Sequence, residues 1–107
     1  MRILLDECVP RPLRRHFAGH DVRTIREMGW AGKKNGELLA LMAADGFEVL
    51  LTVDQNIRYQ QNLVAAGVAV VVLVAATNRL ADLLPLVPSA LAALAAIKPG
   101  DVVEIAS

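Results

Sequence analysis

The stretch MRILLDECVP, residues 1–10, contains a short apolar run that ends in two adjacent acids. Residues 2–6 do not alternate between polar and apolar side chains, which is typical of a strand buried on both faces of a parallel sheet. A similar run, EVLLTVD at residues 48–54, also ends in an acid, and the β-branched run VAVVVLV follows at residues 68–74. These three runs predict a mainly parallel central sheet.

The segments between these runs have the composition of helices and short outer strands. We expect strands at 21–25 and 101–105, the latter at the sheet edge, and a loop at 27–36. We expect helices at 10–18, 35–46 with Asn35 as N-cap, 56–66, and 80–97 with Pro85 and Pro88 near its start or at a kink. This alternation predicts right-handed βαβ units and a three-layer α/β/α sandwich, in one domain over residues 1–107.

The composition limits the functional classes. The chain has 11 Lys plus Arg and 11 Asp plus Glu, so nucleic-acid binding would depend on a local basic patch. Its single cysteine, Cys8, cannot form an internal disulfide and is interpreted as a small buried residue, which predicts a reducing, cytoplasmic setting. The N-terminus lacks signal-peptide features, and the longest apolar run, 63–76, is too short to span a membrane.

Acids follow two of the predicted strands and begin one predicted helix. Asp6 and Glu7 end the first strand, Asp54 follows the third, and Glu37 lies in the first turn of the helix between. Ligands of open α/β sheets bind beyond the carboxyl ends of the strands, so we expect Asp6, Glu37 and Asp54 to converge. Converging carboxylates repel one another unless a cation neutralises them or some of them are protonated, and an all-oxygen set favours Mg²⁺ or Mn²⁺. The chemistry that fits is phosphodiester hydrolysis by a metal-activated water.

Each acid also has a purely structural interpretation. Asp6 could be a solvated loop residue or a helix cap, and Asp54 could be a turn residue. Glu37 is favoured in a first helical turn by the helix dipole alone. The positions of these acids alone therefore do not establish a metal site, and the sequence motifs around them have to be considered.

That support comes from the motifs ILLDE at 3–7, NGELLALMAADG at 35–46 and LLTVDQN at 50–56. Over roughly residues 1–75 the chain resembles the PIN-like nucleases, whose short members often are proposed toxins of bacterial toxin–antitoxin modules. The resemblance implies a metal-dependent ribonuclease in which Asp6, Glu37 and Asp54 are catalytic metal ligands and Glu7 is the second acid of the pair. Asn56 stands where the family often has a further aspartate; its carbonyl could still ligate the metal but adds no charge.

Basic residues near the predicted acidic edge are candidates for holding RNA phosphates. They are Arg11, Arg14, Arg15, Lys33, Lys34 and Arg58. Trp30, in the glycine-rich loop, could stack on a base or pack on the domain. The apolar stretch 80–97 suggests either burial or a homodimer, and the resemblance adds an antitoxin as a possible partner.

Two alternatives remain open at this point. Because the third-strand motif is one charge short, the domain could have a depleted metal site and act as a protein-interaction module. The acids after the first and third strands would also suit a receiver-like phosphate-handling domain, although no lysine convincingly ends a later strand.

Overall fold

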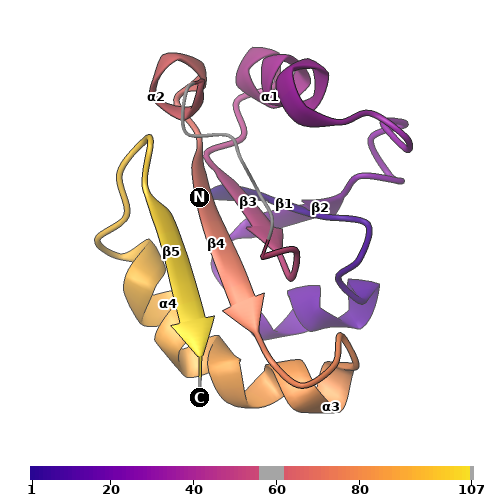
Figure 1. Ribbon diagram of the computed structural model, residues 1–107, viewed down its shortest axis with the longest axis vertical. Coiled ribbons are helices and arrows are strands. Elements are labelled where there is room, and N and C mark those ends of the chain that lie inside the picture. The colour runs from indigo at the N-terminus through magenta and orange to yellow at the C-terminus, as the bar shows by residue number, and fades with distance from the viewer. Residues whose placement is uncertain (56–61, 107) are drawn as a thin grey trace.

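The computed structural model describes residues 1–55 and 62–106, and its centre is a five-stranded parallel sheet (Figure 1). The strand order is β2-β1-β3-β4-β5, and every neighbouring pair is parallel. This confirms the central parallel sheet and the edge position of the last strand. The strands are Arg2–Leu5 (β1), Asp21–Thr24 (β2), Val49–Thr52 (β3), Ala69–Val74 (β4) and Val102–Ala106 (β5).

Helical segments cover both faces of the sheet, which confirms the three-layer α/β sandwich (Figure 1). Ile3 and Leu5 of β1 belong to one apolar cluster, and Leu4 between them belongs to the other, as expected for strands buried on both faces. The second cluster lies under α1 (Asn35–Ala44) and α2 (Leu63–Ala66). The first lies under the 3₁₀ helix η1 (Arg11–His16), α3 (Leu80–Leu83), the 3₁₀ helix η2 (Leu84–Leu86) and α4 (Val87–Leu94).

Neither segment predicted as one helix, 10–18 or 80–97, is a single continuous α-helix in the structure. The first is the shorter 3₁₀ helix η1, and Pro10 before it has extended backbone with ψ of 130°. The second is divided into α3, η2 and α4, with Pro85 near the start of η2 and Pro88 near the start of α4. Proline lacks the N–H that continues an α-helical ladder, so these positions favour new starts over one continuous helix.

The boundaries of the two remaining helices also differ from the prediction. Helix α1 begins at Asn35 itself, and its N-cap is Lys34, whose side chain makes no capping hydrogen bond. Of the helix predicted at 56–66, the described part is α2, which Gly67 ends in a left-handed conformation with φ of 70°. Residues 56–61, including Asn56 and Arg58, lie outside the described residues.

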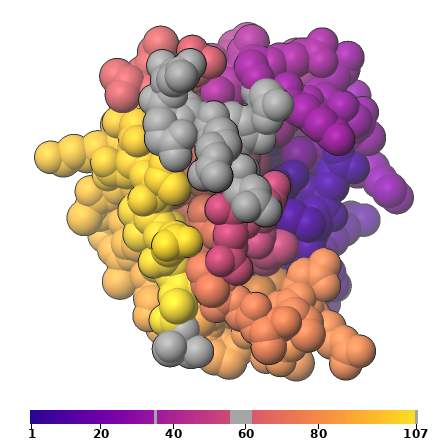
Figure 2. All heavy atoms as spheres, viewed as in Figure 1, coloured from indigo at the N-terminus to yellow at the C-terminus, as the bar shows by residue number. Residues whose placement is uncertain are grey.

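The apolar C-terminal part is used mainly to build the core. Buried positions in it are Leu83, Leu86, Val87, Ala90 and Leu94. This burial accounts for the composition that suggested a homodimer, and the homodimer itself stays a prediction. The edge strand β5, yellow in Figure 2, lies open at the surface. None of the helices in the described parts of the chain is long and apolar enough to cross a membrane.

Candidate metal site at the carboxyl edge of the sheet

The strand order places the ends of β1 and β3 at the switch point of the sheet. From β1 the chain moves outward to β2 and then crosses to β3 on the opposite side of β1. Helices after β1 and after β3 therefore lie on different faces, and in such sheets this point is where ligands bind. Asp6 directly follows β1, and Asp54 follows β3 after one intervening residue. The predicted acids of these two strands are thus neighbours in the fold.

Thr52 links the two acids. Its hydroxyl donates a 2.8 Å hydrogen bond to Oδ2 of Asp6 and accepts a 3.0 Å bond from the backbone N–H of Asp54. The backbone N–H of Asp6 donates to the carbonyl of Leu51 at 2.9 Å, which continues the β1–β3 ladder by one residue. Thr52 is fully buried, so its hydroxyl is held between groups that it satisfies. The Asp6 carboxylate is therefore fixed in place before any ligand binds.

The turn after Asp6 is tied to the loops around it. The other carboxylate oxygen of Asp6 accepts from the backbone N–H of Glu7 at 2.8 Å, and Oε1 of Glu7 accepts from the N–H of Gly32 at 3.1 Å. Glu7 therefore braces the glycine-rich loop. Cys8 is partly buried, with its Sγ 3.6 Å from the Thr52 hydroxyl, and its carbonyl accepts from Asn78 at 3.0 Å. Cys8 is thus partly buried, whereas a buried residue was predicted from the sequence.

A surface depression, called here the acidic hollow, lies over these residues. It is lined by Asp6, Glu7, Cys8, Lys33, Lys34, Leu38, Val53 and Asp54. Three acids and two predicted phosphate-binding lysines thus share one hollow. Trp30 does not line it; the indole packs edge-on against Phe47, with ring centroids 5.7 Å apart, so its packing role holds.

Glu37 is placed differently from the prediction. It lies in the first turn of α1, but it does not line the acidic hollow. Its side chain is 63% exposed, and Oε2 lies 3.5 Å from Nζ of Lys33. The expected convergence of Asp6, Glu37 and Asp54 is therefore reduced in this structure to Asp6 and Asp54. Glu37 instead forms a solvent-exposed ion pair with Lys33, four residues earlier in the chain.

The donor set around the hollow suits a hard divalent cation. Among the described residues, no group of three or more His, Cys, Asp or Glu side chains is close enough to hold a metal ion. Mg²⁺, however, usually keeps several waters and uses only one or two protein carboxylates together with substrate phosphates. Asp6, held by Thr52, and Asp54 beside it meet that requirement. The chemistry of the site therefore fits Mg²⁺ or Mn²⁺ in an open coordination sphere.

The three predicted arginines of η1 have different surroundings. Arg14 forms an ion pair of 2.7 Å with Glu27, and this pairing, with the backbone N–H of Thr24, lowers the pKa of Glu27 to about 2. Arg14 therefore joins η1 to the turn after β2. Arg11 and Arg15 are exposed and make no ion pair within the described chain. They remain available for an anionic ligand.

Two residues near the carboxyl ends of the strands, Thr52 and Arg26, were not singled out from the sequence. Thr52 was the only polar residue inside the run VLLT, and a polar group at a buried strand position needs a partner, which was the available signal. Arg26 follows β2, whose carboxyl end lies at the same edge as that of β1. Arg26 belongs to no recognisable motif, but the parallel pairing of β1 and β2 would have placed it near Asp6.

The comparison with known families agrees with this geometry. A family model described as a PIN like domain matches residues 1–75. The chain belongs to the PIN-like domain family. The matched region holds β1, β2, α1, β3 and β4, and with them every residue that lines the acidic hollow. A PIN-like domain has a nuclease-type fold, so the family match replaces the receiver-like alternative.

The search of curated proteins and the search of solved structures gave no match.

Proposed function

We propose that this PIN-like protein is a Mg²⁺- or Mn²⁺-dependent endoribonuclease. The observation that carries the proposal is the pair Asp6 and Asp54, joined through the buried Thr52 hydroxyl at the switch point of the sheet. A divalent cation bound there would neutralise phosphoryl charge and lower the pKa of a water. Lys33 and Lys34, which line the same hollow, are placed to hold a phosphate next to it.

The acids contribute unequally to the proposed site. Asp6 and Asp54 are its metal ligands, and Glu7, which is tied to Gly32, keeps the loop with the two lysines in place. Glu37 does not line the hollow and pairs with Lys33, which does, so we assign Glu37 an outer position. Asn56 is retained as a candidate ligand from the family resemblance and lies outside the described residues.

The test of this activity is cleavage of labelled single-stranded RNA with Mn²⁺ and with EDTA. Wild type should cut only with the metal. Asp6→Asn and Asp54→Asn should lose more than the roughly 10–100-fold that residues supporting a ligand contribute. Glu104→Gln, which removes an exposed acid from the edge strand β5, is the matched control and should cut normally. Equal rates in Asp6→Asn and wild type would contradict the proposal.

We further propose that the nuclease is the toxin of a toxin–antitoxin module, a role supported by the motifs at 3–7 and 50–56. Induced expression of wild type in a bacterial host should arrest growth, and Asp6→Asn should not. Growth arrest by both proteins would mean that the toxicity does not come from RNA cleavage. An antitoxin partner is expected to relieve the arrest when it is co-expressed.

One observation favours a second candidate, a protein-interaction module without catalysis. Among the described residues, no three His, Cys, Asp or Glu side chains are close enough to hold a metal ion together, and Glu37 lies beside Lys33 instead. This candidate predicts a folded protein that shows no Mn²⁺ binding in calorimetry and no metal-dependent RNA cleavage.

A further inference from the structure

A second hollow lies on the other side of the turn formed by Asp6 and Glu7. We call it the arginine hollow; its lining residues are Leu5, Asp6, Glu7, Val9, Pro10, Arg11, Thr24, Ile25, Arg26 and Glu27. It shares Asp6 and Glu7 with the acidic hollow. The two hollows therefore meet at this turn, one on each side of it.

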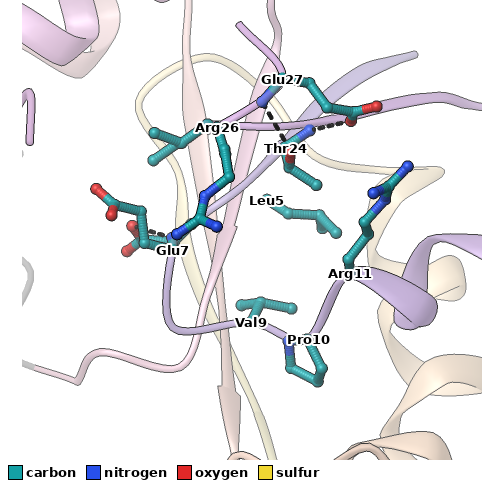
Figure 3. A pocket seen from close by; sticks show the side chains of 10 residues that line it. Leu5, Glu7, Val9, Pro10, Arg11, Thr24, Arg26 and Glu27 are labelled. Carbon is teal, nitrogen blue, oxygen red and sulfur yellow. Dashed lines mark hydrogen bonds between the residues drawn. The ribbon is translucent and has the colours of Figure 1, made fainter. Parts of the chain in front are cut away.

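Two arginines with no protein partner face each other across the arginine hollow. Figure 3 shows Arg11 and Arg26 on opposite sides, with Leu5 between them. Both are exposed, and neither forms an ion pair within residues 1–55 and 62–106. Guanidinium groups in this position are suited to bind phosphate oxygens in a bidentate manner.

Three acids also line the arginine hollow: Asp6, Glu7 and Glu27. Glu27 is held by its ion pair with Arg14 and by the N–H of Thr24, so its charge is already compensated. Asp6 and Glu7 lie at the turn shared with the acidic hollow, where a bound divalent cation would offset their charge. A third depression, lined by Arg11, Pro12, Arg14 and Arg15, shares Arg11 with the arginine hollow. Positive charge thus continues from the arginine hollow along η1, away from the acids.

The floor of the arginine hollow is apolar. Leu5, Val9 and Ile25 line it, and each is less than a tenth exposed. A surface with an unpaired arginine on each side of an apolar floor is complementary to an unpaired nucleotide, whose phosphate is anionic and whose base has apolar faces. A duplex keeps its bases stacked and turned away from such a floor. The chemistry of the hollow therefore favours a single strand.

We propose that one RNA strand crosses the Asp6–Glu7 turn, held by Lys33 and Lys34 on one side and by Arg11 and Arg26 on the other. This inference rests on the proposed nuclease function and adds the course of the substrate. The acids then lie in the middle of the bound strand, with cations on both sides. The protein would accordingly require an internal phosphodiester in a single strand and would bind a mononucleotide poorly.

Binding is tested without cleavage by fluorescence anisotropy of a labelled oligouridylate with wild-type protein in EDTA, over a series of salt concentrations. Each phosphate contact with a single strand contributes about 0.7 to the slope of log K against log salt. Arg11→Ala and Arg26→Ala should each weaken binding and reduce the slope by about that amount. Arg26→Lys should keep most of the slope. Circular dichroism should show native spectra, because both side chains are exposed.

Lys98→Ala is the matched control, because Lys98 is an exposed cation in the turn before β5, at the opposite edge of the sheet. Its affinity and slope should equal those of wild type. Unchanged slopes in Arg11→Ala and Arg26→Ala, with Mn²⁺-dependent cleavage intact, would overturn the proposed course and leave the nuclease function standing. Wild type that neither binds nor cuts the oligomer would overturn both. Stronger binding of duplex RNA would overturn the single-strand assignment, and so would arginine-dependent binding of a labelled oligoglutamate without RNA binding.

Discussion

Thr52 shows how one buried hydroxyl can position a site that lies on the surface. It donates to the Asp6 carboxylate and accepts from the backbone N–H of Asp54, so it holds one carboxylate and the backbone that carries the other. Thr52→Val keeps the shape of the side chain and removes these two hydrogen bonds. We expect Mn²⁺ affinity and cleavage to fall roughly 10–100-fold, because Asp6 loses the group that orients it.

Stability should fall as well, by about 1–3 kcal/mol in urea unfolding, since the N–H of Asp54 loses its acceptor. Thr52→Ser is the matched control, because it keeps the hydroxyl and should retain most of the metal affinity. If Thr52→Val binds Mn²⁺ as tightly as wild type, Thr52 does not position the site.

Glu27 makes a prediction about acid stability. Its ion pair with Arg14 lowers its pKa from 4.5 to about 2, so the native state prefers the charged form more than the unfolded state does. This contribution is fully present above pH 4.5 and is lost as the pH falls through about 2. The pair is partly exposed and is worth only about 0.2–1 kcal/mol.

In Glu27→Gln, the unfolding free energy should therefore fall less steeply than in wild type as the pH is lowered from 4.5 to about 2. Urea unfolding of both proteins at a series of pH values measures this difference. A decline of the same steepness in both would show that the pair does not contribute.

At the scale of elements, two glycines with open space around them should respond in opposite ways to alanine. Gly67 ends α2 in a left-handed conformation with φ of 70°, whereas Gly36 lies within α1 and needs no positive φ. Gly67→Ala should destabilise the protein by about 1–2 kcal/mol, because a Cβ is disfavoured there. Gly36→Ala should stabilise it by about 0.4–1 kcal/mol, because it reduces the entropy of the unfolded chain.

Thermal unfolding of the two variants beside wild type measures both changes in stability in one experiment. Destabilisation by Gly36→Ala would show that α1 does not tolerate a side chain at that position.

The three central strands, β1, β3 and β4, could be predicted from the sequence because both of their faces are buried. Their runs are almost wholly apolar, and acids follow two of them, β1 and β3. The helices were less accessible, because prolines at 85 and 88 divide what composition alone joins, and η1 has too few residues to show a helical period.

The site was predictable to the extent that strand register determines it. Asp6 and Asp54 follow neighbouring parallel strands, so their proximity follows from the sheet. The position of Glu37 does not follow from the sheet, because a side chain on a helix can turn toward any nearby partner. Lys33, four residues away, is such a partner. The packing of η1 beside the end of β2 determines where Arg26 lies and pairs Arg14 with Glu27. No local sequence pattern predicts this packing.

At the scale of the whole molecule, the two edges of the sheet have different roles. The candidate chemistry lies at the carboxyl edge, whereas Arg2 at the amino edge joins Asp21, Asp45 and Phe47. The guanidinium lies 4.2 Å from the Phe47 ring centroid, and hydrogen bonding to Asp45 raises the pKa of Arg2. Arg2→Met should therefore lower the unfolding free energy by about 1–2 kcal/mol through the lost ion pairs and cation–π contact.

The same variant should keep wild-type Mn²⁺ affinity and RNA cleavage. Urea unfolding and the cleavage assay, run on the same sample, separate the two effects. Loss of cleavage in a folded Arg2→Met protein would contradict the claim that the amino edge serves stability alone and the carboxyl edge carries the chemistry.

The central claim is that Asp6 and Asp54 bind a divalent cation at the switch point, and calorimetric titration with Mn²⁺ tests it most directly. Wild type should bind the ion, Glu104→Gln should bind it equally, and Asp6→Asn should lose at least about tenfold in affinity while its circular dichroism spectrum stays native. Wild type that releases no heat of binding, or Asp6→Asn that binds as tightly as wild type, would contradict the account.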